Sequence, residues 1–181
     1  MKSLPTLELE RLILRPFNLE DAPAVQELAG DRYVAETTLY IPHPYADGMA
    51  EGWIKTHLKN FNEGQSLELA IVHKEEQYLI GAISLACNSD FELGELGYWI
   101  GKTYKNNGYC TEAARAMVHY AFTEMKLNRV YARYLDKNPA SGKVMEKLGM
   151  KYEGRLRQHV KKWGNFEDII HYGLLREEYL D

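Results

Sequence analysis

The sequence predicts a mixed α/β fold with a mostly antiparallel central sheet of about seven strands and about four helices. Strand-like segments occur in both halves of the chain, helical segments lie among them, and neither a regular βαβ repeat nor an all-β pattern is present. The 181 residues fit a single domain over residues 1–181, and 45% hydrophobic residues suffice for a buried core.

The N-terminal third predicts one strand and two helices. Arg11–Phe17 alternates as a strand does. The next segment reads as a helix with Asn18 at its N-cap and Gly30 after its end. The prolines in Ile41–Tyr45 make that segment rigid and extended. Residues 48–64 then predict a second helix, weakened by an internal glycine.

The middle of the chain predicts an antiparallel meander followed by a helix. Its three strands are Leu67–His73, Tyr78–Ala86 and Gly94–Gly101, the first two joined by the polar turn "KEEQ". The helix Thr111–Lys126 carries one apolar stripe, made by Ala114, Val118, Ala121, Phe122 and Met125.

The C-terminal third predicts three more strands and one helix. Arg129–Leu135 is a strand, and the helix after it has Asn138 at its N-cap, Pro139 at its first position and Gly149 just past its end. Two long strands close the chain, over residues 151–163 and 166–179.

Charge and motif content exclude several function classes. The net charge of −4 argues against nucleic acid as the main partner, because phosphate binding draws on clustered Lys and Arg. The basic cluster Arg155–Lys162 fits a solvated strand face or a contact with an anionic ligand. The six histidines lack paired spacing such as HExxH, so we expect no metal.

The chain carries the signature of a cytoplasmic protein. Cys87 and Cys110 have no metal-type spacing and need not pair, which fits a reducing compartment. The first residues lack the apolar core of a signal peptide, and no apolar run is long enough to cross a membrane. We therefore expect no membrane partner.

The junction "YKNNGYCTEAAR" (Tyr104–Arg115) has the features of an anion site. The first N–H groups of a helix lack intrahelical partners and lie at the positive end of its dipole. Gly108 permits close approach, Thr111 offers a cap or a hydroxyl, and Lys105 adds a positive charge. An ordinary capped connection is the alternative. The Gly-Lys-Ser/Thr of a P-loop and the glycines of a dinucleotide fingerprint are missing.

Three longer segments resemble the GNAT acetyltransferase superfamily, and most closely its ribosomal-protein N-terminal acetyltransferases of the RimJ/RimL type. They are "LELERLILRPFNLEDA", "ELGYWIGKTYKNNGYCTEAARAMVHYAF" and "LNRVYARYLDKNPASGKVMEKLGMKYEG". The resemblance extends from about Leu7 to Tyr179, including the closing "GNFEDIIHYGLLREEY", with the motifs in the family's order.

The resemblance implies that acetyl-CoA is the acetyl donor and that its pyrophosphate binds the backbone of the junction. The family's loop reads Arg/Gln-x-x-Gly-x-Gly/Ala. The matching positions here are Lys105, Asn106, Asn107, Gly108, Tyr109 and Cys110. Lys105 keeps the charge of arginine but loses its planar fork, and Cys110 replaces a small residue. We expect binding to survive both departures, because the contacts come mainly from backbone.

The resemblance also implies a sheet that splays at the cofactor. The strand ending at Trp99 and Ile100 would diverge from Arg129–Leu135, with the pantetheine arm in the gap and Asn138 near it. A backbone N–H near the end of the Gly94–Gly101 strand would meet the thioester carbonyl.

Acetyl transfer to an amine needs a neutral amine, a polarised carbonyl and a proton for the leaving thiolate. Glu95 is the main candidate base, directly or through water, because alternation puts Gly97 and Trp99 on its face and burial there would raise its pKa. A partly exposed glutamate at a strand edge is the alternative reading. The weaker candidates are Glu92 and Asp168.

Ser141 is the candidate acid. The Rim-type branch carries a serine at the position that "NPAS" gives to Ser141, whose hydroxyl would protonate the thiolate. Capping the helix that starts after Asn138 is an equal alternative. The possible substitutes are Tyr134 and Tyr152.

The acceptor is predicted to be a primary amine that attacks directly in a ternary complex. A protein α-amine has a pKa near 8 and a lysine one near 10.4, so a site with one uncertain carboxylate suits an α-amine better. A small amine (polyamine, amino acid or antibiotic) and a non-catalytic acyl-CoA-binding regulatory module are the alternatives.

The acceptor pocket is predicted between residues 33–48 and the turn Trp163–Phe166. Glu36 and Asp47 would attract a cationic amine there, although loop charges are more often simply solvated. Exposed strand edges at the C-terminus favour a homodimer.

Overall fold

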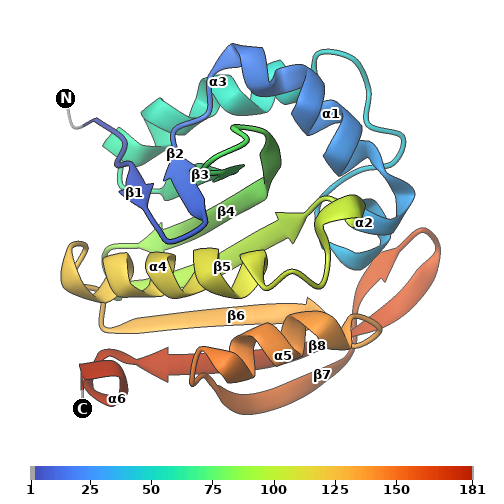
Figure 1. The fold of residues 1–181 in the computed structure, drawn as a ribbon. Coiled ribbons are helices and arrows are strands. Elements are labelled where there is room, and N and C mark those ends of the chain that lie inside the picture. Colours follow the sequence, from blue (N-terminus) through green and yellow to red (C-terminus); the bar gives the residue numbers. More distant parts are fainter. Residues whose placement is uncertain (1–2, 181) are drawn as a thin grey trace.

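The computed structural model describes residues 3–180, which form one eight-stranded sheet with helices on both faces (Figure 1). The strand order is β1-β2-β3-β4-β5-β6-β8-β7, and each neighbouring pair is antiparallel except β5 with β6. The strands are β1 (Leu7–Glu8), β2 (Leu12–Arg15), β3 (Ser66–His73), β4 (Leu79–Asn88), β5 (Leu93–Ile100), β6 (Arg129–Leu135), β7 (Lys151–Lys162) and β8 (Asn165–Leu175).

Most of the helices lie in the connections between strands, and α4 makes the crossover between the parallel strands β5 and β6. Within residues 3–180 the α-helices are α1 (Ala22–Gly30), α2 (Arg32–Thr37), α3 (Met49–Asn62), α4 (Tyr109–Thr123), α5 (Pro139–Lys147) and α6 (Arg176–Leu180). Two short 3-10 turns, Leu19–Asp21 and Lys102–Tyr104, precede α1 and α4. None of the helices in the described range is long and apolar enough to cross a bilayer.

The predicted α/β class and antiparallel sheet are confirmed, with differences at element ends. The short strand β1 was not predicted, and its pairing with β2 makes the eighth strand. The Asn18 cap is confirmed, since its side chain accepts from the Asp21 N–H, although the first turn it caps is 3-10. Gly30 is the last residue of α1 rather than the first after it.

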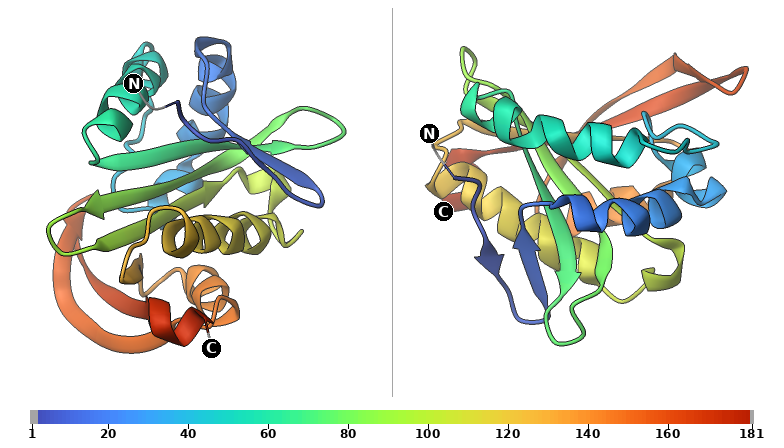
Figure 2. Two further views of the ribbon diagram at one scale, coloured as in Figure 1. Left: turned by 90° about the vertical axis from the view of Figure 1, so that its left-hand side faces the viewer. Right: turned by 90° about the horizontal axis from the view of Figure 1, so that it is seen from above.

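Alternation along the strands builds two cores on opposite faces of the sheet. Leu67, Leu69 and Ile71 of β3 pack with α4 and α5, whereas Ala70 and Val72 pack under α1 and α3. Figure 2 shows these helices on opposite sides of the strands. The predicted stripe of α4 is buried from Ala114 to Phe122, and Met125 lies partly buried just beyond the helix.

The sheet opens in its middle, between β5 and β6, and we call this opening the splay. These parallel strands pair only at Leu93–Glu95 with Arg129–Tyr131. Beyond Glu95, β5 continues to pair with β4 as far as Ile100, and β6 continues to pair with β8 as far as Leu135. The two halves of the sheet therefore diverge toward the start of α4, as the resemblance implied.

One buried polar side chain makes the stability of the fold depend on pH. His57 of α3 is 2% exposed, packs against the rings of Phe17 and Trp53, and has no hydrogen-bond partner for either ring nitrogen within the described residues. Burial lowers its pKa from 6.5 to about 4.

We expect the protein to lose stability as the pH falls from 6.5 toward 4. The folded state holds His57 neutral while the unfolded state binds a proton, and the gap between the two pKa values corresponds to about 3 kcal/mol. Urea unfolding across this range should show the loss, and His57→Phe should reduce it. An unchanged pH slope in His57→Phe would contradict the prediction.

Candidate active site

The junction predicted as an anion site lies between β5 and α4, and we call its residues 105–111 the cradle. Asn106 and Gly108 both adopt positive φ, at 63° and 78°, which turns the chain sharply into the helix. The first helical hydrogen bond runs from the Glu112 N–H to the Gly108 carbonyl oxygen at 3.1 Å. The N–H groups of Tyr109, Cys110 and Thr111 therefore precede the helical ladder at the positive end of the dipole.

Arg11 braces this cradle from the turn between β1 and β2. Its Nε lies 2.8 Å from a carboxylate oxygen of Glu112, and its Nη1 donates to the Asn107 carbonyl oxygen at 2.8 Å. Its guanidinium also lies over the Tyr109 ring, 4.9 Å from the centroid. Sequence reasoning missed Arg11, because more than ninety residues separate it from the loop that it holds.

Two side chains of the cradle are already engaged within the protein. The Lys105 ammonium lies 3.6 Å from the centroid of the Tyr33 ring. The Asn107 side chain donates to the carbonyl oxygens of Tyr104 and Lys105. The cradle thus offers backbone donors, while these two side chains fix its shape.

Cys110 is a half-buried free cysteine at the start of α4. Burial raises the pKa of its thiol to about 12, and burial, with a smaller contribution from Cys110, also raises the pKa of the Tyr98 hydroxyl. Thiolate chemistry is therefore disfavoured at Cys110.

The α4 and α5 side of the splay brings together Ser141 and two tyrosines. Ser141 is 9% exposed, and its Oγ lies 2.9 Å from the Tyr98 hydroxyl oxygen. The Tyr98 hydroxyl also donates to the Ser141 carbonyl oxygen at 3.1 Å. Tyr134 of β6 packs so closely on Gly142 that a Cβ there would lie 2.6 Å from its hydroxyl. Ser141 is therefore anchored to β5 across the opening.

Asn138 occupies the N-cap position of α5, but its side chain does not cap the helix. Its Nδ2 donates instead to the Thr37 carbonyl oxygen at the end of α2, at 3.1 Å. Ser141 likewise bonds Tyr98 through its hydroxyl, and its own N–H donates to the Asn138 carbonyl oxygen. The predicted side-chain capping of α5 is therefore absent. The side chain of Asn138 bonds α2 instead, and that of Ser141 bonds β5.

Glu95 lies on the opposite face of the splay and is held by an ion pair. Its Oε1 accepts from the Arg133 Nε at 2.6 Å, and its Oε2 accepts from the Tyr131 hydroxyl at 3.1 Å. Arg133 also donates to the Tyr40 hydroxyl at 2.9 Å. Both carboxylate oxygens of Glu95 are thus engaged by side chains of β6.

Of the remaining predicted site residues, two lie at the splay and two lie outside it. Trp99 and Ile100 lie on the part of β5 beyond its pairing with β6. Trp99 packs with the core under α1 and α3, and Ile100 packs with the core under α4. Glu92 lies in an exposed turn at the other end of β5, and Tyr152 is 59% exposed on β7.

The two segments predicted to line the acceptor pocket meet at the tip of the β7–β8 hairpin. The Lys162 ammonium donates to the Thr38 carbonyl oxygen, and burial lowers the pKa of Lys162. The Trp163 ring lies 6.1 Å from the His43 ring and beneath the Arg32 guanidinium. Of the acidic candidates, Asp47 accepts from the Gln26 side chain and Glu36 is exposed.

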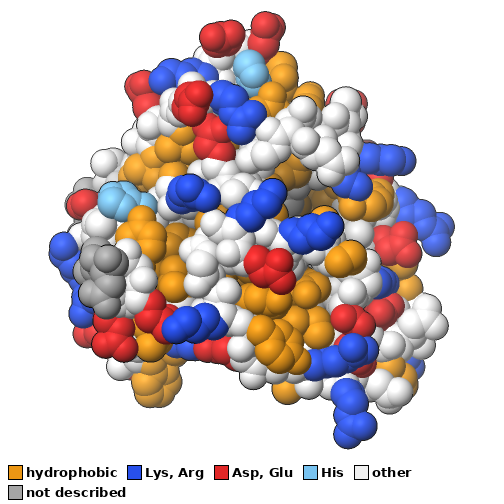
Figure 3. Space-filling model, turned by 60° about the horizontal axis from the view of Figure 1, so that its bottom comes forward, with side chains coloured by type: hydrophobic (Ala, Val, Ile, Leu, Met, Phe, Trp, Pro, Cys, Tyr) orange, Lys and Arg blue, Asp and Glu red, His pale blue; other side chains and the backbone are white. Residues whose placement is uncertain are grey.

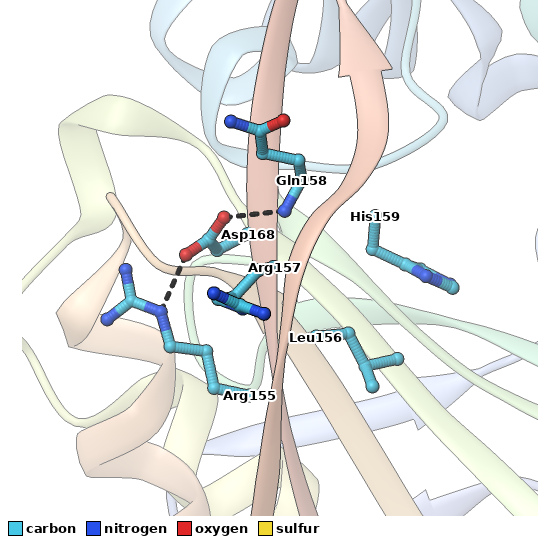
Figure 4. A pocket seen from close by; sticks show the side chains of 6 residues that line it. All are labelled: Arg155, Leu156, Arg157, Gln158, His159 and Asp168. Atoms are coloured by element: carbon cyan, nitrogen blue, oxygen red, sulfur yellow. Dashed lines mark hydrogen bonds and ion pairs between the residues drawn. The ribbon is translucent and has the colours of Figure 1, made fainter.

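The basic cluster of the sequence lies in the same hairpin, and its residues 155–159 line, with Asp168, a hollow of about 650 Å³ (Figure 4). Arg155 pairs with Asp168 at 2.6 Å and with Asp136 at 2.9 Å. Asp168 lies within β8 and also accepts from the Gln158 N–H, and this hydrogen bond together with the Arg155 contact lowers the pKa of its carboxyl. On the face shown in Figure 3, basic and acidic side chains are interleaved.

Comparisons with known proteins agree with this geometry. Residues 11–151 match the family model described as "Acetyltransferase (GNAT) domain". "Uncharacterized N-acetyltransferase YnaD" of Bacillus subtilis (strain 168) is 32% identical over 172 residues, covering 94% of this chain and 96% of the relative. The ribosomal protein uS5 alanine N-acetyltransferase of Escherichia coli (strain K12) is 25% identical over 175 residues, covering 91% and 87%.

A solved structure shows the same fold at low identity. RimL, a ribosomal L7/L12 α-N-protein acetyltransferase in complex with coenzyme A, superposes with a TM-score of 0.86 at 17% identity. The match covers 96% of this chain and 99% of RimL.

Proposed function

Because this chain belongs to the GNAT acetyltransferase family and is a RimJ/RimL-like N-acetyltransferase, we propose that it moves the acetyl group of acetyl-CoA to a protein N-terminal α-amine. The transfer proceeds by direct attack in a ternary complex. The observation that carries the proposal is the splay beside the cradle, because it places backbone donors for a pyrophosphate next to an open strand edge.

The cradle fits the donor substrate. The N–H groups at the start of α4 suit a diphosphate, and RimL binds coenzyme A on the same fold. Acetyl-CoA supplies the thioester whose carbonyl carbon is attacked. The β5 backbone beyond Glu95 would flank the pantetheine arm, and Asn138 lies at the same opening.

The side chains at the splay suit the two proton movements of the reaction. The amine nitrogen forms the amide bond as the C–S bond breaks, so one proton leaves the amine and one reaches the sulfur. Ser141 would donate to the sulfur, and the contact with the Tyr98 hydroxyl would hold its side chain in position. Glu95 remains the proposed route for the amine proton, through water, since Arg133 and Tyr131 occupy its oxygens.

A protein N-terminus is the favoured acceptor for two reasons. One relative in the comparison acts on the alanine of ribosomal protein uS5, and the face that carries Glu95 lies beside a hairpin with exposed aromatic residues. A small amine is the second candidate acceptor.

Donor binding is tested by thermal unfolding in the presence of acetyl-CoA, CoA, ATP and NAD. A ligand at about 100 times its dissociation constant stabilises by roughly 2.7 kcal/mol. For a chain of this size we expect a rise of about 5–10 °C with acetyl-CoA and CoA. A rise with ATP alone, or with none of the four, would contradict the proposal. The choice of acceptor is tested with a short peptide that has a free N-terminus. Its acetylation is measured through the CoA thiol that the reaction releases.

A further inference from the structure

Glu68 of β3 is a half-buried residue with one shielded carboxylate oxygen, and the mechanism above does not use it. Its Oε2 is shielded from solvent and has no hydrogen-bond partner within the described residues. Burial raises its pKa, and the nearby Ser66 hydroxyl offsets only part of that effect. Leaving a carboxylate oxygen buried without a partner is costly, so such a group is commonly matched by a ligand or a counter-charge.

The sheet register places Glu68 in line with the splay. Glu68 lies opposite Ser84 of β4, and Ser84 lies opposite Gly97 of β5. Neighbouring strands are about 4.8 Å apart, so the Cα atoms of Glu68 and Gly97 are roughly 10 Å apart. Gly97 lies on β5 just past its pairing with β6.

Glu68 also points to the face from which an acceptor would approach. Alternation places it with Ala70 and Val72, which pack under α1 and α3. The same face carries Glu95, on the side of the sheet opposite Ser141 and α4. The face is not fully covered here, since Ala86 on the central strand β4 is exposed.

The neighbouring carboxylate cannot readily serve the same purpose. Both oxygens of Glu95 are occupied, one by Arg133 and the other by Tyr131 and Arg133. Glu68 has no such ion pair among the described residues. Compared with Glu95, Glu68 is the carboxylate with an oxygen left for a cationic ligand.

We propose that Glu68 binds an ammonium group of the amine acceptor, an inference that rests on the proposed acetyl transfer. That ammonium is either the reacting amine itself or a second ammonium of a diamine whose other end lies at the splay. In both cases Glu68 selects cationic acceptors and is a substrate-binding residue on the face opposite Ser141.

The test compares Glu68→Gln, which removes the charge at constant shape, with Glu68→Asp, which keeps it. Glu75→Gln is the matched control, because Glu75 is exposed in the turn between β3 and β4. Each protein is assayed for kcat and KM with an alkyl monoamine, the diamine of the same chain length and a short peptide with a free N-terminus. Acetyl-CoA binding is followed by thermal shift.

We expect Glu68→Gln to raise KM by roughly tenfold to a hundredfold, as for loss of a hydrogen bond to a charged group. Acetyl-CoA binding should be unchanged, Glu68→Asp should recover part of the affinity, and Glu75→Gln should behave as wild type. A loss with every acceptor assigns Glu68 to the reacting ammonium, and a loss with the diamine alone assigns it to the second ammonium.

Unchanged KM values in Glu68→Gln for all three acceptors would overturn the inference while leaving acetyl transfer intact. Calorimetry can also test whether amines bind to the CoA complex. If the protein binds acetyl-CoA but its CoA complex binds no amine, the inference about Glu68 is overturned as well. Failure of the wild-type protein to bind acetyl-CoA would instead count against the proposed function.

Discussion

Ser141→Ala should lower kcat by about a hundredfold or more, the usual effect of removing a positioned general acid. Ser141 is 9% exposed beside the opening between β5 and β6, and its hydroxyl contacts that of Tyr98. Because the change removes one oxygen from a buried site, the dissociation constant of CoA should stay close to the wild-type value. Steady-state thiol release and CoA titration separate the two quantities.

The matched control is Ser89→Ala, at an exposed serine in the turn between β4 and β5. Tyr98→Phe provides a second comparison, because it removes the partner of Ser141 but leaves the serine hydroxyl in place. We expect its effect on kcat to be smaller than that of Ser141→Ala. A wild-type kcat in Ser141→Ala would show that the thiolate takes its proton from another group, and Tyr134 would then be the next candidate.

Much of the fold was predictable because its signals are local. Alternating segments became β3, β4, β5 and β6 with ends shifted by a residue or two, and the helix signal at Pro139 gave α5. The short strand β1 has only two residues, too few for a period to be visible, and it exists because β2 pairs with it.

The site was predictable where it depends on one segment and unpredictable where it depends on several. The cradle lies in one stretch, so Gly108 and the start of α4 could be found from their residue types. The Arg11 brace, the Tyr98 contact to Ser141 and the ion pair between Arg133 and Glu95 join residues far apart in sequence. A single sequence gives no measure of such contacts, which depend on strand order and register.

The second large effect is expected on acetyl-CoA binding, when Gly108 of the cradle is substituted. Gly108→Val should weaken acetyl-CoA binding roughly a hundredfold or more, because two or three backbone donors to the pyrophosphate would be displaced. Gly108 has a φ of 78°, which a β-branched residue adopts only with strain, and an added Cβ would lie 3.4 Å from Arg11 Nη2. The chain would relieve that strain by moving the N–H groups at the start of α4.

Gly64→Val separates loss of binding from loss of stability. Gly64 has a similar φ of 71°, in the turn between α3 and β3, and has open space around the position of a Cβ. Both variants should lose about 1–2 kcal/mol of stability from left-handed backbone strain. Only Gly108→Val should also lose the thermal shift with acetyl-CoA. If the two variants retained equal shifts, the pyrophosphate would not depend on this turn, and the start of α4 would be an ordinary helix connection.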